Sequence, residues 1–198
     1  MNVALAEEYV LLQLRTQLPA ILYYHGVHHT LDVTQAAMQL ATAEGITDET
    51  ERQLLRTAAL YHDTGFLRTY TGHEAEGCAL VREVLPTFDY QPTQIETICA
   101  MIMATRLPQD PHSHLAEILC DADLDYLGRP DFEPIAHTLF LEFQARQLVT
   151  ADEEAWNRSQ EQFLAQHHYW TTTATAWREA PKQARLAEIR EKLSTSLQ

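Results

Sequence analysis

The amino-acid sequence predicts an all-α fold. Apolar residues recur at helical spacing along almost the whole chain, and no alternating run of β-branched residues is long enough to predict a strand. Most prolines stand between these apolar segments, where they do not interrupt a helix. The chain has 198 residues, which lies within the range of one domain that can bury a substantial core. We therefore expect a single helical domain over residues 1–198.

The individual helices follow from periodicity and from their end signals. The first is amphipathic, with apolar residues that include Leu5, Val10, Leu11 and Leu14. Gly45 ends the second helix, and acids at Asp48 and Glu49 suit the N-terminus of the third. The expected helices are 3–17, 27–43, 48–61, 73–85, 93–104, 115–127, 132–146, 152–167, 169–178 and 182–197. Pro181 separates the last two helices in this prediction.

The pair His62-Asp63 is the first indication of a functional site. Leu55, Ala58 and Ala59 precede this histidine at helical spacing, so the imidazole lies on the apolar side of a helix. A single histidine on such a face is usually a core residue with a hydrogen-bond partner. A carboxylate beside it at a buried helix end is costly unless it is paired or bound to a metal. The pair therefore favours a metal site.

Two further groups point in the same direction. His29 begins a second apolar helix, whose buried side is predicted to contain Val33, Ala36, Ala37 and Leu40. Near residue 120, three acids alternate within an otherwise apolar helix: Asp121, Asp123 and Asp125. Acidic helix faces are usually solvated. Because these acids alternate with apolar residues, at least one carboxylate must approach the core.

In this order of histidine, His-Asp pair and late aspartate, the chain resembles the H…HD…D signature of the HD superfamily of metal-dependent phosphohydrolases. The similarity covers about residues 20 to 145. It implies an all-helical HD-type metal-binding core over those residues, with residues 150–198 as a C-terminal helical extension. The resemblance also implies a divalent metal ion, such as Mn²⁺, Fe²⁺, Co²⁺, Ni²⁺ or Mg²⁺, held by His29, His62 and Asp63. The last ligand is Asp121 or Asp123; Asp123 is favoured because it follows an alanine, as in the family, but both stay open.

Other family positions are only partly filled. His73 stands where some members place the first of two further histidines that hold a second metal, so it is a candidate ligand for a second ion. Thr105 or Arg106 takes the place of the other histidine, which argues against a stable two-metal centre. Many members have a lysine three residues after the aspartate of the pair, and here that residue is Phe66. A catalytic cation must therefore come from elsewhere, for instance Arg68 or Arg106.

Three residues are candidates for a catalytic role. Asp63 belongs to the His-Asp pair. Glu74 could handle a proton beside the metal, or serve only as an acid at a helix N-terminus. Arg106 could pair with a phosphate oxygen, or be an ordinary surface cation.

Composition limits the partners. The formal net charge is −14, and no dense run of Lys or Arg is present, so nucleic acid is not expected to be a partner. No apolar stretch reaches the ~18 residues that a membrane span needs, and we expect no leader, because Glu7 and Glu8 interrupt the N-terminal apolar run. Three widely spaced cysteines, Cys78, Cys99 and Cys120, fit reduced core residues. We expect a soluble, cytoplasmic protein that acts on a small phosphorylated molecule.

An aromatic cluster follows residue 152. It comprises Trp156, Phe163, Leu164, His167, His168, Tyr169 and Trp170. We interpret it as part of a helix pair that packs back over the core. The alternative is a cover over the substrate, with His167 or His168 at the mouth of the site.

These features favour a metal-dependent phosphohydrolase, either a phosphomonoesterase or a phosphodiesterase, that acts on a nucleotide or another small phosphorylated molecule through a metal-activated water. The alternative is a catalytically weak HD domain that binds a nucleotide or a metal as a regulatory module. The intact histidine, His-Asp pair and aspartate favour the enzyme. The absent lysine and the absent later histidine keep the regulatory module open.

Overall fold

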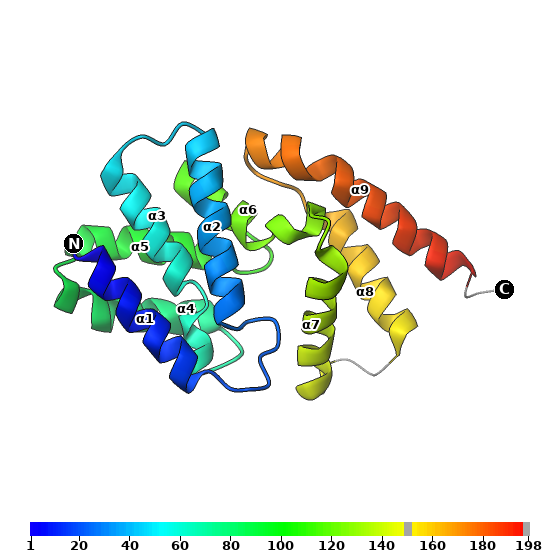
Figure 1. Cartoon of the computed structure of the whole chain (residues 1–198), viewed down its shortest axis with the longest axis horizontal. Coiled ribbons are helices and arrows are strands. Elements are labelled where there is room, and N and C mark those ends of the chain that lie inside the picture. The colour runs from blue at the N-terminus through cyan, green and yellow to red at the C-terminus, as the bar shows by residue number, and fades with distance from the viewer. Residues whose placement is uncertain (149–151, 196–198) are drawn as a thin grey trace.

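The computed structural model describes residues 1–148 and 152–195. Within these ranges the chain forms nine α-helices, three short 3-10 helices and no strand, which confirms the all-α prediction (Figure 1). The α-helices are α1 (Val3–Gln17), α2 (Val27–Ala43), α3 (Glu49–Tyr61), α4 (His73–Val84), α5 (Pro92–Ala104), α6 (His114–Asp123), α7 (Phe132–Ala145), α8 (Glu153–Gln166) and α9 (Thr172–Thr195). The 3-10 helices are η1 (Thr64–Leu67), η2 (Leu85–Phe88) and η3 (Asp125–Gly128). None of the described helices is both long enough and apolar enough to cross a membrane.

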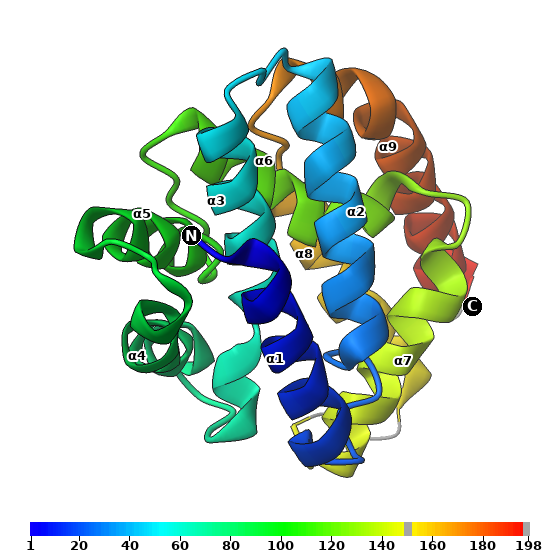
Figure 2. The ribbon, with the colours of Figure 1, turned by 60° about the vertical axis from the view of Figure 1, so that its left-hand side comes forward.

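Two apolar cores meet near the middle of the molecule. The larger is built mainly by α1 to α6, where the apolar residues of the predicted helix stripes are buried, among them Leu55, Ala59 and Val33. The smaller core joins η3, α7, α8 and α9 to Tyr24, which stands before α2. Both ribbon views show α7 and α9 together on one side of α2 (Figures 1 and 2). The histidines and acids of the predicted site lie close to the place where these cores meet.

The predicted helix over residues 115–127 is too long at its C-terminal end. Helix α6 ends at Asp123, and the chain continues into η3. In this turn Asp125 accepts a 2.6 Å hydrogen bond from Nε of Arg178 on α9. A Cβ atom on Gly128 would lie 2.4 Å from the carbonyl oxygen of Arg178, so only glycine permits this contact. The contact with α9 therefore decides where α6 stops.

The predicted break at Pro181 is wrong, because α9 continues through this residue. Proline has no N–H to donate within a helix and usually interrupts it. Here packing on both sides of the proline holds the helix together. Lys182 is fully buried, donates a 2.6 Å hydrogen bond to the carbonyl oxygen of His167 and pairs with Glu179 at 2.9 Å. Leu186 lies one turn further on and is buried in the smaller core.

Candidate metal centre

The sequence places His29 in the first turn of α2. This helix begins after Gly26, whose carbonyl oxygen accepts a hydrogen bond from the backbone N–H of His29. The ring is buried against Tyr24, with ring centroids 4.5 Å apart. Its Nε2 atom lies 3.1 Å from Oδ1 of Asp123, at the end of α6. The apolar side of α2 thus carries this imidazole to the end of a helix far away in the sequence.

The geometry of His62 leaves one ring nitrogen free for a ligand. His62 is the residue directly after α3, and its Nδ1 lies 2.8 Å from the carbonyl oxygen of Ala59. Since a carbonyl can only accept, Nδ1 carries the proton, and Nε2 of the neutral ring presents a lone pair. Nε2 is buried and has no hydrogen-bond partner among the described residues. A buried nitrogen without a partner is costly, which fits a site for a cation.

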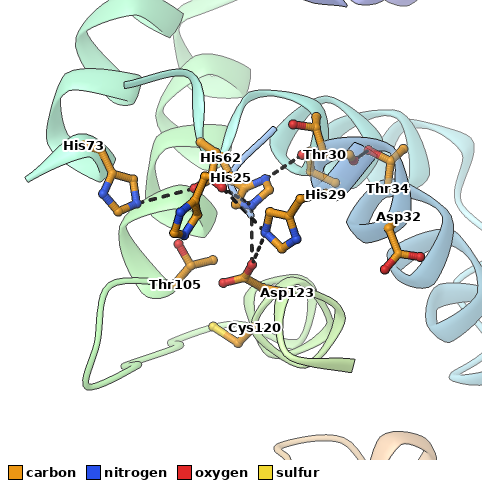
Figure 3. A network of polar contacts seen from close by, with 12 residues as sticks. His25, His29, Thr30, Asp32, Thr34, His62, His73, Thr105, Cys120 and Asp123 are labelled. Carbon is orange, nitrogen blue, oxygen red and sulfur yellow. Dashed lines mark hydrogen bonds and ion pairs between the residues drawn. The ribbon is translucent and has the colours of Figure 1, made fainter. Parts of the chain in front are cut away.

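Asp123 and the two histidines form a compact group of potential ligands. One ligand atom from each of His29, His62 and Asp123 lies within 4.8 Å of the other two. Figure 3 shows both rings directed at the Asp123 carboxylate, and Asp32 on the same helix as His29 directed away from it. Such a set of two imidazoles and a carboxylate suits a divalent transition metal.

Asp63 borders this group. Its Oδ2 lies 3.3 Å from Nε2 of His62 and 3.6 Å from Nε2 of His29. This oxygen is buried and, like Nε2 of His62, makes no hydrogen bond among the described residues. Its other oxygen, Oδ1, lies 3.4 Å from Nε2 of His73. The donor set around Asp63 therefore fits a divalent ion, with Oδ2 available as a fourth ligand.

The charges of the group explain why it favours a cation. Burial opposes a charge on His62, but Asp63 and Asp123 raise its pKa well above the ordinary value. Burial likewise opposes charge on both carboxylates, yet the neighbouring histidines lower the pKa of Asp63 and of Asp123 below the ordinary value. The two acids thus keep their negative charge inside the protein. A bound divalent ion would supply the positive charge that a protonated histidine otherwise supplies.

Asp121, the other candidate for the last ligand, points elsewhere. It is fully buried and accepts two 2.8 Å hydrogen bonds, from the backbone N–H groups of Trp170 and Thr171. Burial raises the pKa of Asp121 to about 6, although these hydrogen bonds act in the opposite direction. Asp121 therefore ties α6 to the start of α9, and we assign the last ligand position to Asp123.

The Asp123→Asn and Asp121→Asn variants should separate these two roles. Asp123→Asn is expected to weaken metal binding by more than the ~10–100-fold that the loss of an outer hydrogen bond costs. Asp121→Asn should keep its metal but lower the free energy of unfolding by ~1–3 kcal/mol, because one backbone N–H loses its acceptor. Metal analysis and urea unfolding of both variants test this. Loss of metal in Asp121→Asn alone would reverse the assignment.

His73 lies beside the group but has fewer partners. It is the first residue of α4 and stacks on Phe66, with ring centroids 3.9 Å apart. A Cβ atom on Gly65 would lie 1.8 Å from the carbonyl oxygen of His73, so glycine is required to bring η1 and α4 this close. Burial opposes charge on His73, but Asp63 raises its pKa above the ordinary value.

A second metal at this position would have few ligands. Among the acids that the structure describes, Nε2 of His73 has Oε1 of Glu74 nearby besides Asp63, at 3.7 Å. Thr105 lines the same cavity, but its hydroxyl donates to the carbonyl oxygen of Ile102. His73 therefore stays a candidate ligand for a second metal.

The other two candidates for catalysis, Glu74 and Arg106, both line a cavity of about 600 Å³ that opens beside Asp63 and Asp123. Glu74 is buried on α4. Arg106 is exposed just after α5, and its guanidinium makes no ion pair with any described residue. Its position allows it to meet an anion that enters the cavity.

Two residues of the site, His25 and Glu142, were not among the candidates that the sequence analysis identified. His25 also lines the cavity, and its Nδ1 lies 2.5 Å from Oε1 of Glu142 on α7. Glu142 is fully buried and also accepts hydrogen bonds from the backbone N–H groups of Tyr24 and His25 and from the hydroxyl of Tyr70. Burial opposes its charge, but these contacts, first among them His25, lower the pKa of Glu142. His25 precedes α2, so no helical periodicity marks it, and its partner is 117 residues away in the sequence.

The comparisons with known proteins agree with this geometry. A profile of the HD domain family matches residues 26–125, which includes His29, His62, Asp63 and Asp123. A crystal structure described as a predicted HD superfamily hydrolase, from an uncultured Thermotogales bacterium, aligns with a TM-score of 0.61 and 22% sequence identity. The alignment covers 95% of this chain and 91% of that one. A search of curated proteins gave no match. Since the profile covers half of the chain and contains the group of ligands, this protein belongs to the HD domain family.

Proposed function

We propose that this protein is a metal-dependent phosphohydrolase, a phosphomonoesterase or phosphodiesterase for a nucleotide or another small phosphorylated molecule. The observation that carries the proposal is a pair of buried atoms, Nε2 of His62 and Oδ2 of Asp63, that lie 3.3 Å apart beside the ligand group and make no hydrogen bond among the described residues. The similar structure bears the description of a hydrolase, and this supports a hydrolytic reaction in the present chain.

His29, His62, Asp63 and Asp123 would hold the divalent ion. When bound there, the ion would act as a Lewis acid that makes a water molecule more acidic and withdraws charge from the phosphate. Asp63 and Asp123 remain charged, so they can also orient that water through its protons. Arg106 at the cavity wall would pair with a phosphate oxygen and keep the ester in position.

The leaving oxygen also needs a proton, and the pair of His25 and Glu142 is placed to supply it. Because Glu142 accepts the hydrogen bond from Nδ1, the Nε2 side of the ring is available to a substrate in the cavity. The buried carboxylate of Glu142 also fixes the orientation of the His25 ring through this contact. We therefore assign His25 as the general acid and Glu142 as the residue that orients it.

Hydrolysis assays on metal-stripped protein test the proposal. The substrates would be nucleoside mono-, di- and triphosphates, cyclic nucleotides and an aryl phosphate, each with Mn²⁺, Co²⁺, Ni²⁺, Mg²⁺ or Fe²⁺ added back. We expect turnover of at least one ester only after a metal is restored.

The same assay includes the outcome that contradicts the proposal. The alternative, a regulatory module, rests on the residue at position 66, where many HD proteins have a lysine and this chain has Phe66. The ring of Phe66 lies between His25 and His73, with centroid distances of 4.4 and 3.9 Å. No lysine of the described chain reaches this cavity. Saturable nucleotide binding without turnover under any metal would favour the regulatory module instead.

A further inference from the structure

The cavity beside the metal centre has a second, apolar part. Beyond Tyr24 and Tyr126 it continues between α7 and α8. We call this part the apolar lobe; its walls include Leu127, Phe132, Leu139, Phe143, Trp156 and Phe163. Of the aromatic cluster of the tail, Trp156, Phe163 and Leu164 line the cavity, and the last two also pack in the smaller core. Tyr169 is buried in the larger core and does not line the cavity. His167 and His168 are not among the residues that line it.

The apolar side chains that line the lobe are partly exposed to solvent. The side chains that line the lobe include four that are only half-buried, Leu139, Phe143, Trp156 and Phe163, so apolar surface of the cavity stays accessible to solvent. Trp156 is held by Phe140 and Phe143, with ring centroids 5.2 and 6.0 Å away. A concave apolar surface of this kind gains free energy when an apolar group removes it from water. Among the described residues of the lobe, Ser159 and Gln160 are the only polar partners, and none of these residues carries a charged side chain.

The charges at the polar end of the cavity limit the number of phosphate groups that a bound ligand can carry. Its wall carries three carboxylates, Asp63, Glu74 and Asp123, and among the described residues Arg106 is its single guanidinium. A divalent ion at the ligand group and Arg106 would together carry three positive charges, which offset the three carboxylates, so each phosphate group adds negative charge to the site. Every further phosphate of a di- or triphosphate would face the carboxylates with little compensation, inside a chain of net charge −14.

We propose that the substrate is a phosphate monoester of an apolar alcohol, with its phosphate at the metal centre and its organic group in the apolar lobe. This rests on the proposed function. In the reaction, the oxygen of water forms a bond to phosphorus, and the bond from phosphorus to the ester oxygen breaks. The ester oxygen takes a proton and leaves as the alcohol, and inorganic phosphate is the other product. The C-terminal helices α7 and α8 thus select the substrate, while α2, α3 and α6 bind the metal.

Binding of alkyl phosphonates to the Mn²⁺-loaded protein tests the lobe separately from hydrolysis, because their carbon–phosphorus bond is not cleaved. Methyl, butyl and octyl phosphonate would be titrated by calorimetry, with adenosine monophosphate and adenosine triphosphate for comparison. Each buried methylene is expected to tighten binding about fourfold. The octyl compound should bind more tightly than both nucleotides.

Variants of the lobe supply the control. Trp156→Ala and Phe163→Ala should weaken octyl phosphonate binding roughly tenfold or more and leave methyl phosphonate binding unchanged. Trp177→Ala, which removes an exposed tryptophan on the outer surface of α9, should change neither. Metal content and circular dichroism would be checked for each variant.

The outcomes separate the two proposals. An affinity that does not change with chain length, or that is unaffected by both lobe variants, would overturn the assignment of the lobe, even if nucleotides are hydrolysed. Dependence on chain length that both lobe variants reduce would support the assignment, even if no ester is turned over and the hydrolase proposal fails.

Discussion

His62→Ala and Asp63→Ala are each expected to remove the bound metal and lower turnover by at least ~10³-fold, because the ion contributes several kcal/mol of transition-state stabilisation. The expectation follows from two buried atoms, Nε2 of His62 and Oδ2 of Asp63, that have no other hydrogen-bond partner in the described structure. Metal per chain, measured on purified protein, and turnover of the best substrate would be compared with the unchanged protein.

The helical content of these variants should stay close to that of the unchanged protein. Neither residue belongs to the apolar cores, and α3 already ends at Tyr61. His112→Ala provides a matched control, because this histidine is exposed in the loop before α6 and pairs with Asp110, away from the ligand group. If His62→Ala and Asp63→Ala both keep a full complement of metal, the assignment of the centre is wrong.

His25→Ala should lower kcat by ~10²–10⁴-fold for esters whose leaving alcohol needs a proton. The loss should be much smaller for an aryl phosphate, whose leaving group departs as an anion without help. Metal content should not change, because His25 bonds to Glu142 and not to the ligand group. Glu142→Gln should show the same dependence on the leaving group with a smaller loss. The comparison of kcat between alkyl and aryl esters is the measurement.

This comparison distinguishes proton donation from a structural role. A variant that merely disturbed the site would lose activity on both esters to the same extent. His28→Ala is the control, since His28 is exposed three residues further along the same segment. Equal losses on alkyl and aryl esters, or loss of metal from His25→Ala, would exclude His25 as the general acid.

The amino-acid sequence contained most of the fold. Apolar spacing predicted α1 and α2 with their observed ends, because each helix buries one apolar stripe, which contains Val10 and Leu14 in α1 and Val33, Ala36, Ala37 and Leu40 in α2. Where the prediction failed, a distant contact was responsible. Packing around Lys182 carries α9 through Pro181, and the contact between Gly128 and Arg178 ends α6 early. Local propensity cannot anticipate a partner that is far away in the chain.

The sequence by itself determined the all-α fold and indicated His29, His62, Asp63 and a late aspartate as the candidate site. The histidines stand at helix ends on apolar faces, and the late acids alternate with apolar residues. The tertiary structure decided which aspartate lies beside these residues: Asp123 meets His29, whereas Asp121 binds the backbone of α9. It also brought His25 to Glu142 and formed the apolar lobe between α7 and α8. The physical reason is that Asp121 and Asp123 on one helix differ in the direction that their side chains face. Which groups each carboxylate contacts depends on how the other helices pack around α6.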